Sequence, residues 1–149
     1  MGFSNIATFL ASGNICFDSS LKSAEEIRQT IEKGIKKSFG LEIQTMARSL
    51  EDLKRLAARA PFFDYLVPDD IRFYVSFLGS PNSTSLEIPF KSPGGGLEIP
   101  LVIEGEVFSM VRLSKGYGTL DAMDFLEKEF GRVITTRNWN TIEKILAGK

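Results

Sequence analysis

The chain has no histidine and only one cysteine, Cys16, and these two shortages exclude more chemistry than any residue present suggests. Without histidine, Ser-His-Asp and Cys-His nucleophile systems and histidine-ligated zinc or iron sites are ruled out. A single cysteine allows no intramolecular disulfide and no thiolate metal cluster, which favours a reducing compartment. Any chemistry would depend on carboxylates, lysine, tyrosine or a hard cation, and we expect no cofactor and no metal site.

Long apolar runs and an excess of one charge are also missing. No stretch approaches the ~20 apolar residues that cross a bilayer, and the amino terminus lacks an export signal, so we expect a cytoplasmic protein with no membrane partner. The 18 basic and 19 acidic residues give a net charge of −1. Because polyanion binding is driven by cationic side chains that displace counterions, this balance argues against nucleic acid as a partner.

What is present fits one globular domain. The 149 residues are 43% hydrophobic and 25% charged, and include 12 phenylalanines. A chain of this length buries roughly two-thirds of the surface that its unfolded form exposes. We therefore predict a single domain over residues 1–149, with two halves of approximately residues 1–66 and 67–149.

The first half shows two strands, a helix, a strand and a helix. Apolar segments at 3–10 and 15–18 flank Ser12-Gly13-Asn14, which suits a tight turn. Ser23 begins a helix with a capping box and Gly40 ends it. Alternation predicts a strand over 41–47, and a second helix follows, with Ser49 at its start and Pro61 after it.

The second half shows a similar order. Residues 71–78 alternate as a strand with one wet face, and 79–96 are rich in proline, serine and glycine and are predicted to be a long loop. Segments 97–103 and 107–113 form a hairpin. A helix over 120–130, a short strand at 133–135 and a last helix from the Asn140 cap to residue 146 complete the half. The pattern predicts an α+β fold of two ferredoxin-like, split β-α-β halves, with mostly antiparallel sheets and helices packed on one face.

Three strings are distinctive: GFSNIATF at 2–9, SGNICF at 12–17 and TTRNWNTI at 135–142. Together they resemble the bacterial family catalogued as domain of unknown function 1697, which carries a GF..V.TY..SGN..F pattern near its start and a TTRNWNT signature near its end. The resemblance covers essentially the whole chain and implies two ferredoxin-like halves. It implies no reaction, because the family has no established activity to carry over.

The chain departs from the family pattern in two places. Members usually carry a strand and a helix before the Gly-Phe that is Gly2-Phe3 here, so the resemblance implies a first sheet that lacks one strand. Such an edge is one that a second copy could cover, which makes a homodimer an expected partner arrangement. Members also place Ser-Lys-Leu where this chain has Gly118-Thr119-Leu120.

The candidate ligand site is Arg137, Asn138, Trp139 and Asn140. A strand that runs into a helix start presents amide donors beside a guanidinium, and a small anion could bind there. A structural interpretation explains the same residues: Asn140 caps the helix, Trp139 packs in the core and Arg137 pairs with a carboxylate. The two interpretations differ in whether the Arg137 and Asn138 side chains face a cleft or bond internally.

Three further residues join the candidate set. Ser12 and Asn14 could bring amides to a ligand, although a tight turn explains the same tripeptide. Lys115 lies in a glycine-containing segment that faintly resembles a phosphate loop without its spacing.

The leading hypothesis is a binding or interaction module around residues 137–140. The first alternative is an enzyme acting on a nucleotide or phosphorylated small molecule, with Lys115 and Arg137 neutralising an anion in one pocket. The second is a ferredoxin-like sheet that stacks RNA bases near Arg72 and Tyr74.

Overall fold

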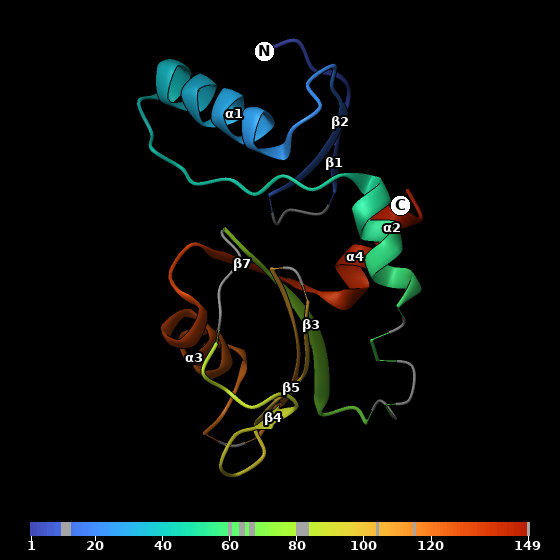
Figure 1. Cartoon of the computed structure of the whole chain (residues 1–149), viewed down its shortest axis with the longest axis vertical. Coiled ribbons are helices and arrows are strands. Elements are labelled where there is room, and N and C mark those ends of the chain that lie inside the picture. The colour runs from blue at the N-terminus through green and yellow to red at the C-terminus, as the bar shows by residue number, and fades with distance from the viewer. Residues whose placement is uncertain are drawn as a thin grey trace. The chain divides into compact units, whose positions relative to one another are not determined.

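The computed structural model describes residues 1–9, 13–59, 61–62, 65, 68–79, 84–103, 105–114 and 116–148. Four helices and two antiparallel sheets, of two and five strands, are formed by these residues (Figure 1). The α+β class and the antiparallel sheets are therefore confirmed, whereas the ferredoxin-like order is not.

The chain divides into two compact units. The N-terminal unit holds residues 1–54 and 145–149, and the sheet unit holds residues 55–144. The helix α2 (Leu50–Ala58) contains the boundary between them. One domain over residues 1–149 stays a prediction.

The N-terminal unit contains a β-hairpin and a long helix. Strands β1 (Ser4–Phe9) and β2 (Asn14–Asp18) pair with Phe9 opposite Asn14. The helix α1 (Ala24–Phe39) begins where the Ser23 hydroxyl accepts the Glu26 amide, and it ends at Gly40, whose φ of 69° is the left-handed value that glycine adopts without strain. Both predicted caps are confirmed.

Residues 41–49 form no strand, so the strand predicted over 41–47 is wrong. The carboxylate of Glu32 on α1 accepts the Thr45 amide at 2.8 Å and the Thr45 hydroxyl at 3.3 Å. Alternation predicted a strand, but no neighbouring strand within the described residues pairs with this segment, and a side chain takes the amide instead. Leu41 and Ile43 remain about half exposed.

The sheet unit is built on five antiparallel strands in the order β4-β5-β6-β3-β7. The strands are β3 (Ile71–Leu78), β4 (Phe90–Lys91), β5 (Leu97–Ile103), β6 (Glu106–Arg112) and β7 (Ile134–Asn138). The helices α3 (Thr119–Phe130) and α4 (Trp139–Leu146) precede and follow β7. The segment predicted as one long loop contains β4, because Phe90 and Lys91 pair with Ile99 and Glu98.

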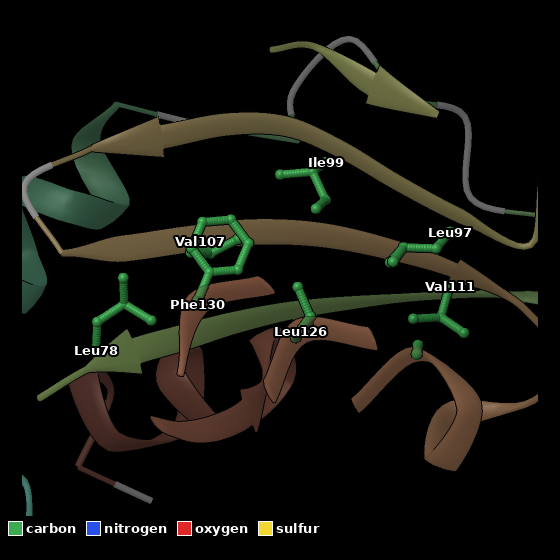
Figure 2. Packing of buried hydrophobic residues seen from close by; sticks show 8 residues of the cluster. Leu78, Leu97, Ile99, Val107, Val111, Leu126 and Phe130 are labelled. Atoms are coloured by element: carbon green, nitrogen blue, oxygen red, sulfur yellow. The ribbon is translucent and has the colours of Figure 1, made fainter. Parts of the chain in front are cut away.

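One face of this sheet packs against α3. Buried side chains of β3, β5 and β6 meet those of α3 in one cluster (Figure 2): Leu78, Leu97, Ile99, Val107, Val111, Ala122, Leu126 and Phe130. Ser76 lies on this face with no exposed surface, and its hydroxyl bonds to the Thr136 hydroxyl at 2.7 Å. The prediction of a wet face for β3 is therefore wrong, since α3 lies over that face.

The other face carries an aromatic cluster. Phe108 points away from α3 because it alternates with Val107, and its ring meets those of Phe62 at 5.9 Å and Trp139 at 6.0 Å. Phe62 also stacks on Phe73 at 4.4 Å. Both faces of the central strands are thus covered, and the long edges of the sheet are β4 and β7.

Candidate functional site

The outer edge of β7 is the first component of the site. Gly79 donates its amide to the Val133 carbonyl at 2.8 Å, and β7 continues this antiparallel register with Thr135 opposite Phe77 and Arg137 opposite Val75. In such a ladder, alternate residues direct their amide and carbonyl to the neighbouring strand. Residues 133, 135 and 137 therefore bond to β3.

The intervening residues Ile134, Thr136 and Asn138 direct their backbone amides outward. The Ile134 carbonyl also points outward, whereas the Thr136 carbonyl accepts Arg137 Nη1 at 2.9 Å and the Asn138 carbonyl is taken by the start of α4. In the part of the chain that the structure describes, no strand pairs with this side of β7. An unpaired strand edge is a template on which another extended chain can form a ladder. The edge therefore presents three consecutive outward positions of one strand.

A hollow of about 310 Å³ lies beside this edge. One wall is a stripe of α3 side chains at every fourth position, and the other is β7, with Tyr74 of β3 between them; the lining residues are Tyr74, Thr119, Met123, Glu127, Ile134, Thr135 and Thr136. Side chains four residues apart on a helix share one face, so this stripe is continuous. The hollow thus joins an apolar and acidic helix wall to a strand edge.

The two walls run in opposite directions. The Tyr74 hydroxyl bonds to Thr119, the first residue of α3, at 3.0 Å, and Tyr74 pairs with Asn138, the last residue of β7. At the other end, Phe130 of α3 packs in the same cluster as Leu78, which pairs with Ile134. The start of α3 therefore lies by the end of β7.

The predicted residues 138–140 have structural roles here. Asn138 accepts the Asn140 amide through Oδ1 at 3.0 Å, so Asn138 caps α4 and Asn140 is inside the helix and exposed. This corrects the expected cap at Asn140, because the strand continues to residue 138 and the helix starts earlier. Trp139 is 9% exposed and its ring meets that of Phe62 edge-on at 5.4 Å.

Arg137 does not line the hollow. Its Nη1 donates to the Thr136 carbonyl at 2.9 Å and so occupies that group of the strand edge. The Arg137 side chain is half-buried, and this desolvation lowers the pKa of its guanidinium. Residues 137–140 are thus ordered, but their side chains do not converge on one ligand site.

The remaining candidates are Asn14, Ser12 and Lys115. Asn14 belongs to the N-terminal unit, where its Nδ2 donates to the Phe9 carbonyl across the hairpin at 3.3 Å. Ser12 and Lys115 lie outside the described residues. The pocket expected to join Lys115 to Arg137 therefore stays a prediction.

The sheet face expected to stack RNA bases carries a helix. Tyr74 is half-buried, with its hydroxyl on Thr119 of α3, and Arg72 donates to the carbonyls of Asp69 and Ile71. Sequence reasoning missed Met123, Glu127, Ile134 and Thr136 as site residues. The spacing of Thr119, Met123 and Glu127 was visible, but which neighbour this stripe faces depends on the strand order.

Comparison with protein families gives a match over most of the chain. The family described as "Protein of unknown function (DUF1697)" matches residues 1–108 of the 149. The chain belongs to the DUF1697 family. The family resemblance suggested by the sequence is therefore confirmed. The matched part of this DUF1697 chain contains two of the strings that suggested it, at 2–9 and 12–17. The string at 135–142 follows the matched part.

The other comparisons give the DUF1697 chain no relative of known activity. No curated protein and no solved structure matches it. Among the described residues, no helix is long and apolar enough to span a bilayer. The same residues hold no group of three or more carboxylates and thiols arranged for a metal ion.

Proposed function

We propose that the sheet unit is a protein-interaction module that binds an extended peptide segment by strand addition to β7. The observation that carries this proposal is the row of outward backbone amides at Ile134, Thr136 and Asn138 beside the hollow between α3 and β7. Strand addition derives its affinity from main-chain hydrogen bonds and its selectivity from pockets that take alternate side chains. The β7 edge offers the ladder and the hollow offers the pocket.

The dimensions support a peptide rather than a small ion. A hollow of about 310 Å³ is at the low end of ligand sites and can take one or two side chains. Three of the four hydroxyls among its lining residues are already bonded, Tyr74 with Thr119 and Thr136 with Ser76. The polar groups left to recognise a ligand include the amides of the strand edge and the carboxylate of Glu127.

The experiment compares Thr136→Pro with Thr136→Val. Both substitutions remove the hydroxyl that bonds to Ser76, but only proline removes the outward amide, and proline is tolerated on an edge strand. A library of random heptapeptides is selected against the unaltered chain, and the affinity of enriched peptides is measured by fluorescence anisotropy. We expect binding to survive in Thr136→Val and to fall about tenfold in Thr136→Pro, the scale of one lost backbone hydrogen bond.

Three results would contradict the proposal. If no peptide is enriched, the proposal of a peptide-binding module is wrong. If the enriched peptides bind both variants equally, they bind at a site other than the β7 edge. Self-association of the unaltered chain that Thr136→Pro abolishes would assign the edge to a second copy instead of a peptide. Circular dichroism and thermal unfolding of both variants show whether the sheet is intact.

A further inference from the structure

Resting on the strand addition proposed above, we infer that the β7 site selects a peptide with an apolar residue followed, two positions along, by lysine or arginine. The hollow has two distinct positions on its helix wall, Met123 and Glu127. We take the added strand to be antiparallel to β7, as the other strands of the sheet are to their neighbours, so that it runs in the direction of α3 and passes Met123 before Glu127.

The spacing of the two positions matches a strand. Met123 and Glu127 are four residues apart, which is about 6 Å along a helix. Two residues of a strand span about 6.7 Å, and only alternate side chains point to one face. Because α3 runs alongside β7 in the opposite direction, two consecutive inward side chains of an added strand fall opposite Met123 and Glu127.

The first position is apolar. Met123 is half-buried and packs against the core cluster, and Ile134 faces it from β7. Leu120, one turn before Met123, is 81% exposed, so it extends this apolar surface beyond the hollow. A leucine, isoleucine or valine of the added strand would cover surface that is now in water.

The second position is acidic. Glu127 is exposed, and no cation pairs with its carboxylate within the described residues. Its helix carries four carboxylates, Asp121, Asp124, Glu127 and Glu129, against one cation, Lys128. Like charges oppose and unlike charges favour an approaching strand, so the helix wall disfavours an acidic peptide and favours a basic one.

The test uses three acetylated heptapeptides of threonine, a residue that favours strands. The first carries leucine at its third position and lysine at its fifth, the second replaces the lysine by glutamate, and the third replaces the leucine by threonine. Affinities for the unaltered chain are measured by fluorescence anisotropy at low salt. We expect the first peptide to bind about threefold to tenfold more tightly than the second, and the difference to shrink at 0.5 M salt.

Charge reversal assigns the preference to one carboxylate. Glu127→Lys should reverse the order of the first two peptides. Asp124→Lys is the matched control, because it makes the same change of charge on the same helix at a residue that does not line the hollow, and it should keep the order. Met123→Thr should remove the preference for leucine over threonine.

The outcomes separate this inference from the function on which it rests. If all three peptides bind equally and Thr136→Pro weakens them all, strand addition stands and the apolar-then-basic preference is wrong. Equal effects of Glu127→Lys and Asp124→Lys on the order of the peptides would also contradict the inference. The net charge of α3, and not the carboxylate in the hollow, would then explain the preference for lysine. If neither these peptides nor the random library binds, strand addition itself is wrong.

Discussion

Phe62 holds the aromatic side of the sheet unit together, although it lies in no helix or strand. Its side chain is 8% exposed, and its ring meets those of Phe73 at 4.4 Å, Trp139 at 5.4 Å and Phe108 at 5.9 Å. Truncating a buried phenylalanine to alanine costs about 3–5 kcal/mol, and each ring pair adds about 0.5–1.5 kcal/mol beyond area burial. We therefore expect Phe62→Ala to lower the free energy of unfolding by about 3–4 kcal/mol.

The assay is urea unfolding followed by tryptophan fluorescence. Trp139 is the only tryptophan and lies against Phe62, so its emission reports on this unit. With a denaturant slope of about 1–2 kcal/mol per molar, the midpoint should fall by about 1.5–4 M. The matched control is Leu120→Ala, since Leu120 lies in the same unit, is 81% exposed at the start of α3 and should change the midpoint little. Equal shifts for the two variants would refute the aromatic cluster as a stabilising core.

Three further changes test local features. Ser49→Ala removes the hydroxyl that caps α2 and should cost that helix about 1 kcal/mol, with Ser49→Asp as the restoring control, measured by amide hydrogen exchange. The Thr45 amide lowers the pKa of Glu32 from its usual value, so the N-terminal unit should lose stability as pH falls through that lowered pKa; Glu32→Gln should remove this contribution from a pH series of thermal unfolding. Gly96→Ala would place Cβ 2.6 Å from the Tyr117 ring and cost about 1–3 kcal/mol, and Tyr117→Ala should relieve that clash in a double-mutant cycle.

Local signals in the sequence were enough to predict most elements. The caps at Ser23, Ser49 and Gly40 and the strand over 71–78 appear where the pattern placed them. Each depends on neighbours within a few residues, whose chemistry is visible in the chain. The strand expected at 41–47 failed because a strand also needs a partner, which alternation alone does not reveal.

The candidate site was harder to predict because it depends on strand order. The sequence marked residues 137–140 by their unusual composition, but two of these residues serve the fold, with Asn138 as a helix cap and Trp139 in the core. Among the described residues β7 is an edge strand because it pairs with β3 on one side and with no strand on the other. Such pairings join residues far apart in the chain, and no local pattern in this sequence fixes them.

Within residues 134–140, some groups stabilise the fold and others remain available to a ligand. Trp139 in the aromatic cluster and the Asn138 cap hold the end of β7, while its pairing with β3 holds residues 133, 135 and 137. Because these constraints fix the strand in the free protein, the outward groups of Ile134 and Thr136 would need no ordering for the proposed strand addition. Under that proposal, a substitution at Trp139 should weaken peptide binding by loosening the edge, whereas one at Thr136 should act on the hydrogen bonds of the ladder directly.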